Sequence, residues 1–438
     1  MPETRMAKPE DIRSAVGRVL LYISFPFGFM GFILPIYGEA IGASATAIGV
    51  LFSVFSVMTL VLRPVVGYSL DRWGRRPFLL AGVSLYAVTM LTFAAAANYT
   101  GLLLARTVQG IASAAMWLAV YGIVSDISPA ERRGQNYGAM QQRANAGGLY
   151  GATLGFIVLL LVQHATGAPQ TPLAIQAAFG LYFVISLYAV AKAVRVPETA
   201  RLRSAVDAAV TVQEELAEGR VATDQPCAVS PVRASSPDRR LFGPRYVGLL
   251  GGVLLTSTGY GMLAPLMMIY LMAKTGASIV ELGLAYLPAG VVWAALPEKA
   301  GQIADRRGRR KFMILGLLTS AAVALIVPAS TRLWPLAIVW AAEAAALSLA
   351  IPAEQAVVSD LTGADVRGQA YGYYDAAYAT GFTLGPLLGG WLFDQVGHAA
   401  PFYANALILL VASAVIAVAL RGFKTPTAQA ARNPLPSR

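Results

Sequence analysis

Gly-Tyr-Ser-Leu-Asp-Arg-Trp-Gly-Arg-Arg at residues 67–76 recurs with few changes as Gly-Gln-Ile-Ala-Asp-Arg-Arg-Gly-Arg-Arg at residues 301–310. Asp71 of the first copy and Asp305 of the second are 234 positions apart (305 − 71). The same separation relates Val-Ser-Asp at 124–126 to 358–360, and Arg-Gly-Gln-x-Tyr-Gly at 133–138 to 367–372. Independent chance matches would not share one separation. The sequence therefore predicts two related halves.

The composition places the chain in a lipid bilayer. Of its 438 residues 56% are hydrophobic and only 13% are charged, with a mean hydropathy of +0.59, which a water-soluble surface does not tolerate. The net charge of +11 is carried by short basic clusters between apolar runs, so we expect no nucleic-acid partner. One cysteine, Cys227, and two distant histidines, His164 and His398, predict neither a metal site nor a cofactor.

Twelve apolar runs are long enough to span a membrane, since one span needs about 20 residues. The sequence thus predicts an all-α membrane protein with two six-helix bundles, joined by a linker rich in charged residues, proline and serine. The expected spans are 15–37, 45–70, 77–97, 101–124, 136–162, 172–194, 245–272, 280–303, 312–328, 334–359, 368–393 and 401–420. The predicted domains are residues 1–194, the linker 195–244 and residues 245–438. Pro26 and Pro265 predict breaks in the first and seventh spans.

The distribution of basic residues gives an expected orientation. Loops on the N-terminal side hold eleven arginine and lysine residues, whereas the opposite loops hold only Lys274 and Arg332. By the positive-inside rule both termini and the linker are expected to be cytoplasmic. A single chain contains both halves and is expected to work as a monomer.

Two copies of Gly-x-x-x-Asp-Arg-x-Gly-Arg-Arg, each after the second span of its half, resemble the signature loop of the major facilitator superfamily. Leu102-x-x-x-Arg106-x-x-Gln109-Gly110 in the fourth span and Pro197-Glu198-Thr199 after the sixth also fit. The resemblance covers nearly the whole chain. It implies a secondary transporter of the plasma or bacterial inner membrane that moves a small molecule by alternating access and most resembles proton-coupled drug exporters.

The signature loops carry residues that resemble the family's cytoplasmic latch, which holds the outward-facing state and breaks for inward opening. They are Gly67, Asp71, Arg72, Arg75 and Asp126 in the first half, and Gly301, Asp305, Arg309 and Asp360 in the second. Each carboxylate can accept charge-assisted hydrogen bonds from a guanidinium group. The alternative is that these charges only follow membrane topology.

Glycines spaced four apart line one stripe of the fifth and eleventh spans, where they let another helix approach closely. They are Gly147, Gly151 and Gly155, and Gly381, Gly385 and Gly389 beside Pro386. The second set resembles the family's antiporter signature, which normally lies in the fifth span. There Ala152 takes the proline position, so helix packing is the competing interpretation.

Charged side chains within spans are the best functional candidates, because each costs at least about 2.5–3.5 kcal/mol to insert. Arg106 matches the family's fourth-span arginine, which is associated with proton coupling in drug exporters. Trp117 lies eleven residues later, or about three turns, so the two share a face. We expect Arg106 to lie over an aromatic wall; the alternative is a structural arginine bonded to helix carbonyls.

Glu343 occupies the position in the tenth span that the repeat pairs with Gln109 in the fourth. Removed from water, its carboxyl is expected to hold a proton readily near neutral pH. Glu354 follows eleven residues later on the same face, so one carboxyl could pass protons to the other. Alternatively Glu343 is kept neutral for packing and Glu354 belongs to the cytoplasmic mouth.

The eleventh span carries Asp375 with Tyr371, Tyr374 and Tyr378 at helical spacings, which predicts an acidic patch lined by aromatic rings. Arg143 in the fifth span is a candidate counter-charge to Asp375 or to an anionic substrate.

The favoured function is export of small amphipathic compounds in exchange for protons. One alternative is a proton-coupled importer of a sugar, organic acid or other metabolite, in which Arg106 and Arg143 would bind an anion. Another is a transporter-like membrane receptor, although a receptor has no need of both latch copies. An enzyme is not expected, because the sequence has neither a nucleophile–base constellation nor a phosphate-binding loop.

Overall fold

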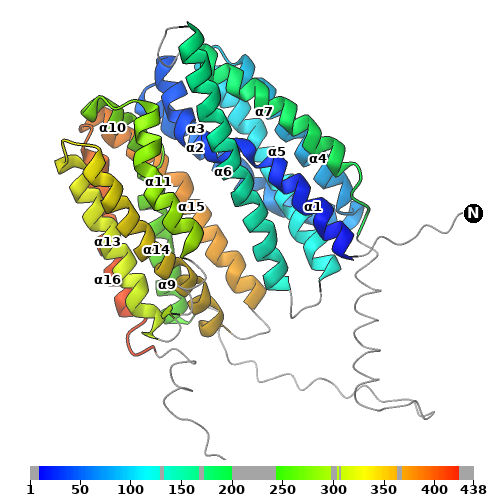
Figure 1. The fold of residues 1–438 in the computed structure, drawn as a ribbon. Coiled ribbons are helices and arrows are strands. Elements are labelled where there is room, and N and C mark those ends of the chain that lie inside the picture. Colours follow the sequence, from blue (N-terminus) through cyan, green and yellow to red (C-terminus); the bar gives the residue numbers. More distant parts are fainter. Residues whose placement is uncertain are drawn as a thin grey trace, which may run out of the picture. The chain divides into compact units, whose positions relative to one another are not determined.

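A computed structural model describes residues 9–128, 133–166, 172–199, 243–296, 303–304, 307–362 and 367–423 (Figure 1). Within these ranges every regular element is a helix. In the first half the helices are α1 (Pro9–Ile23), α2 (Phe25–Ala40), α3 (Ala45–Trp73), α4 (Arg76–Ala95), α5 (Tyr99–Ile127), α6 (Arg133–Thr166) and α7 (Pro172–Ala193). In the second half they are α9 (Pro244–Leu263), α10 (Met267–Thr275), α11 (Ile279–Ala295), α13 (Arg309–Ala329), α14 (Trp334–Leu361), α15 (Arg367–Gln395) and α16 (Ala400–Ala419).

The first and seventh predicted spans are each broken into two helices. The first break lies at Ser24 between α1 and α2, and the other lies between Leu263 and Met267. Pro26 and Pro265 have no backbone N–H to donate along the helix, which accounts for both breaks.

Ten helical segments of the described chain are long and apolar enough to cross a membrane, with α1 and α2 counted as one. The predicted eighth span, 280–303, is helical only over the 17 residues of α11 before the described chain is interrupted after residue 296. The predicted eleventh span corresponds to α15, a 29-residue helix whose glycines, tyrosines and charges lower its apolar character. The prediction of helices at all twelve places is therefore met, although two of them are less apolar or shorter than the rest.

The chain divides into two compact units. The first comprises Met1–Ala43 with Val54–Pro231, and the second comprises Ser44–Ser53 with Val232–Arg438. The start of α3 joins the second unit because Asp394 of α15 accepts hydrogen bonds from the backbone N–H groups of Ala45 (3.2 Å) and Thr46 (2.8 Å). Each unit has its own buried core, built in the first around Val16, Tyr86, Met116 and Ile123, and in the second around Tyr246, Leu317, Val357 and Leu409.

Glycine stripes bring helix backbones together in each unit. A Cβ on Gly151 of α6 would lie 1.8 Å from the carbonyl oxygen of Phe25, and one on Gly147 would lie 2.1 Å from that of Leu21. On α15, a Cβ on Gly385 would lie 2.3 Å from the carbonyl oxygen of Thr258. At such distances no side chain fits, so α6 packs on α1 and α2, and α15 packs on α9, through bare backbone.

Gly155, Gly381 and Gly389 continue these stripes. A Cβ on Gly155 would lie 2.2 Å from the Tyr182 hydroxyl, one on Gly381 would lie 2.1 Å from Ser257 Oγ, and one on Gly389 would lie 2.4 Å from the Met262 carbonyl oxygen. The ring of Pro386 packs against Gly261 of α9, where a Cβ would lie 3.1 Å from Cδ of the proline. The stripe on α15 therefore extends along most of the α9 contact.

Candidate transport site

The signature loop of the first half is a tight turn between α3 and α4. Gly74 has a φ of +93°, a conformation that side chains disfavour, and Gly308 of the second copy has a φ of +103°. Arg75 follows the turn and points back, so that its Nε donates to Asp126 Oδ2 at 3.0 Å and its Nη1 donates to the Leu70 carbonyl at 2.9 Å. Arg75 and Asp126 are both buried. Their ion pair joins the loop to the end of α5.

Glu198 adds a second fastening to this loop. Its carboxylate accepts the backbone N–H of Arg75 at 2.9 Å and that of Arg76 at 3.0 Å, where α4 begins and N–H groups lack helical partners. Thr199 donates its hydroxyl to Asp126 Oδ2 at 3.1 Å. Pro197-Glu198-Thr199 was predicted only as part of the family resemblance. A single acidic residue directly after a span, beside a basic loop, is the sequence signal that could have indicated this contact.

The second half repeats the central pair, because Arg309 Nη1 is bonded to Asp360 Oδ2. A further contact is common to both halves: Arg76 Nη2 donates to the Val194 carbonyl at 2.9 Å and Arg310 Nη2 donates to the Ala417 carbonyl at 2.8 Å. In each half the last arginine of the motif, Arg76 or Arg310, is thus hydrogen-bonded to the end of the last span of that half.

Several latch predictions are not tested by these contacts. Gly301 and Asp305 lie outside the described residues, as do residues 200–242 of the linker. The side chain of Asp71 is likewise not described. Gly67 has open space beside it, and Arg72 is exposed at the end of α3.

Arg106 lies buried in α5 of the first unit with a neutral hydrogen-bond partner. Its Nη1 donates to Gln109 Oε1 at 2.8 Å, and Gln109 Nε2 approaches Met30 Sδ at 3.4 Å. The guanidinium group lies 5.2 Å from the centroid of the Phe55 ring. Trp117 instead packs against Tyr121, with ring centroids 5.8 Å apart. Arg106 and Trp117 were predicted to share one face of this helix, but eleven residues separate them by about 16 Å along its axis. The aromatic partner of Arg106 therefore comes from another helix.

Glu343 lies half-buried on α14 of the second unit among hydroxyl groups. The Ser320 side chain of α13 lies near its carboxyl and can serve it as a hydrogen-bond donor. Ser320 Oγ in turn lies 3.4 Å from the Tyr260 hydroxyl of α9. A short chain of polar groups therefore leads from Glu343 toward α9.

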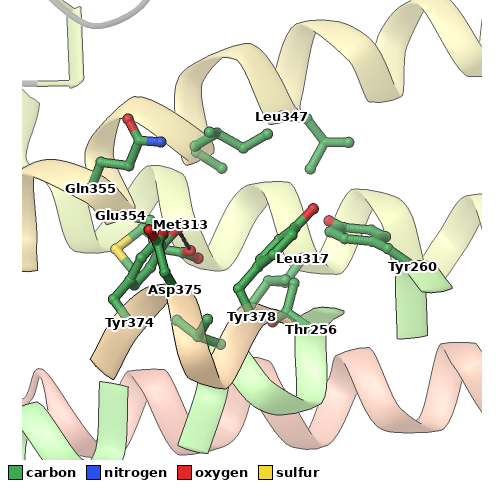
Figure 2. Close-up of a pocket in the computed structure, with 13 residues that line it drawn as sticks. Thr256, Tyr260, Met313, Leu317, Leu347, Glu354, Gln355, Tyr374, Asp375 and Tyr378 are labelled. Carbon is green, nitrogen blue, oxygen red and sulfur yellow. Dashed lines mark hydrogen bonds between the residues drawn. The ribbon is translucent and has the colours of Figure 1, made fainter. Parts of the chain in front are cut away.

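A cavity of about 260 Å³ opens at the other end of this chain. It is lined from α9, α13, α14 and α15, and its polar lining includes Tyr260, Glu354, Tyr374, Asp375 and Tyr378. Figure 2 shows Tyr374 and Asp375 of α15 beside Glu354, while Tyr378 of the same helix points toward the side of Tyr260. Tyr374 donates its hydroxyl to Glu354 Oε1 at 2.7 Å. Of the patch predicted around Asp375, Tyr374 and Tyr378 line this cavity together with Glu354. Tyr371 does not line it and instead donates its hydroxyl to the Gln355 carbonyl at 2.9 Å.

The comparisons with known proteins agree with this architecture. A family model described as Major Facilitator Superfamily matches residues 19–297 and again 249–437. The chain belongs to the Major Facilitator Superfamily. Membership settles the predicted fold class of two six-helix halves, and it makes the protein an integral membrane transporter rather than an enzyme.

Relatives of this major facilitator chain include an amine transporter and a quinolone resistance protein. It is 26% identical over 358 residues to the chromaffin granule amine transporter of Homo sapiens, which covers 80% of this chain and 61% of the relative. It is 27% identical over 141 residues to the quinolone resistance protein NorA of Staphylococcus aureus, which covers 31% of this chain and 36% of NorA. The chain thus spans less than two thirds of either relative.

Solved major facilitator structures share the fold at low sequence identity. A bacterial homologue of the human lysosomal transporter Spinster superposes with a TM-score of 0.67 at 15% identity, covering 95% of this chain and 97% of that one. The human organic anion transporter MFSD10 (TETRAN) superposes with a TM-score of 0.61 at 19% identity, covering 94% and 100%. These similarities concern the fold alone.

Arg143 belongs to the first unit, whereas the residues that line the acidic cavity belong to the second. It is exposed on α6 in the first unit, where its side chain packs beside Gly17 of α1. Its role as a counter-charge stays a prediction. Among the described residues, no group of three or more His, Cys, Asp or Glu side chains is arranged to hold a metal ion.

Proposed function

We propose that the protein exports small amphipathic compounds in exchange for protons by alternating access. We place it in the plasma or bacterial inner membrane, where it works as a monomer. Both termini lie in the cytoplasm, since its loops follow the positive-inside rule. The observation that carries the proposal is the cavity of the second unit, where Glu354, bonded to Tyr374, faces the same space as Asp375 and Tyr378.

The lining of this cavity suits a compound with a basic nitrogen and an apolar body. Glu354 and Asp375 supply negative charge, the tyrosine rings can face a cation, and Met313 and Leu317 supply apolar contact. Its volume of about 260 Å³ is just below the range of about 300–1,000 Å³ usual for drug-sized ligands, so the substrate is small. The names of the amine transporter and NorA accord with this class.

We infer that protons reach the cavity through hydroxyl groups. Glu343 gives up its proton toward Ser320 and Tyr260, and each hydroxyl accepts one proton while it donates another, so both return unchanged. Tyr260 also lines the cavity that holds Glu354. A proton leaving Glu343 can thus exchange with a cation that binds the carboxylates, and the two positive charges need not occupy the site together.

The proposal is tested in proteoliposomes with an acidic lumen and a pH-sensitive dye inside. Amphipathic amines, organic anions and sugars are added in turn to the wild type, to Glu343→Gln and to Glu39→Gln. Glu39 is an exposed carboxyl at the end of α2, outside the proposed path. We expect an amine to raise the luminal pH with the wild type and Glu39→Gln, but not with Glu343→Gln.

Other outcomes would favour the alternatives. Uptake of an anion together with protons would indicate symport, for which the buried Arg106 is the supporting observation. Substrate transport that leaves the luminal pH unchanged would exclude Glu343 as the coupling group. Binding without any transport would favour a receptor.

A further inference from the structure

The first unit contains a second cavity, of about 710 Å³, between α1 and α6. Its charged lining side chains are Arg13 and Arg18 of α1, Arg143 of α6 and Glu10 at the start of α1. Three arginines and one glutamate give this cleft a formal charge of +2. No step of the proposed export mechanism uses it.

Two of the three arginines are held in place by neutral partners. Arg13 Nη1 donates to Asn136 Oδ1 at 3.0 Å, and Asn136 Nδ2 donates to Ser128 Oγ at 2.7 Å, which fixes the amide. Arg18 Nη1 donates to Ser14 Oγ at 2.8 Å. None of the three cleft arginines is in an ion pair with a described residue. Their positive charge is therefore available to a ligand.

The side chain of Arg143 reaches this cleft by passing over Gly17 of α1, which has no side chain to block it. A Cβ on Gly17 would lie 3.6 Å from Cγ of Arg143 and 3.8 Å from Cε of Met140. Gly17 and Met140 are buried and form an apolar floor beneath the charged rim. The cleft thus offers guanidinium groups to an anion and an apolar surface to whatever carries it.

We propose that this cleft binds a phosphate ester. Guanidinium groups form planar forks that match phosphate oxygens, and several of them here face one space. The volume lies within the range of about 300–1,000 Å³ typical of ligand sites, so it has room for an organic group beyond the phosphate. Arg13 lies just before the expected start of the first span at residue 15, and Arg18 lies in its first turn. Basic pockets between helices at this depth meet lipid headgroups. A phospholipid headgroup and a soluble phosphate ester share this chemistry.

The test uses the full chain in a neutral detergent and follows binding by microscale thermophoresis. Three probes are compared: dihexanoyl phosphatidylglycerol, glycerol 3-phosphate and zwitterionic dihexanoyl phosphatidylcholine. We expect at least one of the two anionic probes to bind at least tenfold more tightly than phosphatidylcholine. Replacing Arg13 or Arg143 with glutamine should weaken that binding by about ten- to a hundredfold, since each removes charge-assisted hydrogen bonds.

Two control variants accompany the test. Arg195→Gln removes an exposed arginine after α7 that does not line the cleft, and it should bind like the wild type. Arg143→Lys keeps the charge without the fork, so its affinity should fall between those of the wild type and Arg143→Gln.

Each outcome decides the proposal. Binding of the lipid alone identifies a headgroup site, and equal binding of glycerol 3-phosphate identifies a soluble ester; both support it. The proposal fails if no anionic probe binds, if phosphatidylcholine binds as tightly as phosphatidylglycerol, or if monodisperse Arg143→Gln and Arg143→Lys both bind like the wild type. Proton flux is not read out, so these results stand apart from those on export.

Discussion

Adding one methyl group to Gly151 should destabilise the first unit. The new Cβ would lie 1.8 Å from the Phe25 carbonyl oxygen, whereas ordinary contact begins at 3.4 Å, so α6 and the α1–α2 junction must separate by up to 1.6 Å (3.4 − 1.8). Overpacking of this kind costs about 1–3 kcal/mol. Alanine in place of glycine returns up to about 1 kcal/mol of helix propensity. We therefore expect Gly151→Ala to lower the free energy of unfolding by about 0–3 kcal/mol.

Gly138, on the same helix, is the matched control because nothing lies within 4 Å of its Cβ position. Gly138→Ala should raise stability by up to about 1 kcal/mol. The repeat supplies the same experiment in the second unit, where Gly385→Ala meets the Thr258 carbonyl and Gly372→Ala meets nothing within 4 Å.

The assay is equilibrium unfolding of each variant in mixed micelles, followed by tryptophan fluorescence. Within each half the crowded variant should be less stable than its control by about 1–3 kcal/mol, which is the overpacking cost alone because the propensity gain cancels. Equal stability within either pair would refute the claim that these stripes hold helix backbones in contact.

Three further substitutions test the sites. Asp126→Asn removes the carboxylate charge that the buried Arg75 contacts at 3.0 Å and should destabilise the first unit by about 3–5 kcal/mol, measured by the same unfolding assay; a loss below about 1 kcal/mol would contradict a buried ion pair. Glu198→Gln should cost about 0.5–1.5 kcal/mol, because an amide oxygen accepts the loop N–H groups more weakly than a carboxylate does, and equal proteolysis of the loop in both proteins would argue against this fastening. Tyr374→Phe removes the 2.7 Å bond to Glu354 and should raise the KM for the transported amine about two- to tenfold, whereas an unchanged KM would place the substrate elsewhere.

The helical fold was predictable because the features that determine it are local or repeated. Apolar length indicates a span, and a shared separation of 234 positions indicates duplication. Each copy of the repeated motif contains a glycine, Gly74 or Gly308, and both adopt the positive φ that glycine tolerates.

The partners of the candidate residues were harder to predict because they come from other helices. Periodicity places Arg106 and Trp117 on one face of α5, but it contains no information on which neighbouring helix supplies Phe55. Glu198 lies 123 residues from the N–H group of Arg75 that it accepts. Ser320 and Tyr260 are single polar residues within apolar spans, and nothing in the sequence around them indicates a partner. Only the packing of α9 and α13 brings them near Glu343.

The duplication also indicates where function has to be sought. Positions that agree between the halves, such as the arginine–aspartate pairs and the glycine stripes, build the scaffold twice. The charged candidates are positions where the halves differ: Arg106 is matched by Trp340, Glu343 by Gln109, Glu354 by Val120 and Asp375 by Gln141. Inserting each such charge into the membrane costs at least about 2.5–3.5 kcal/mol, which has to be offset. Because the other half folds with glutamine or valine at the matching position, the fold itself does not require the charge. We therefore propose that the acids of the second half and Arg106 of the first serve transport rather than folding.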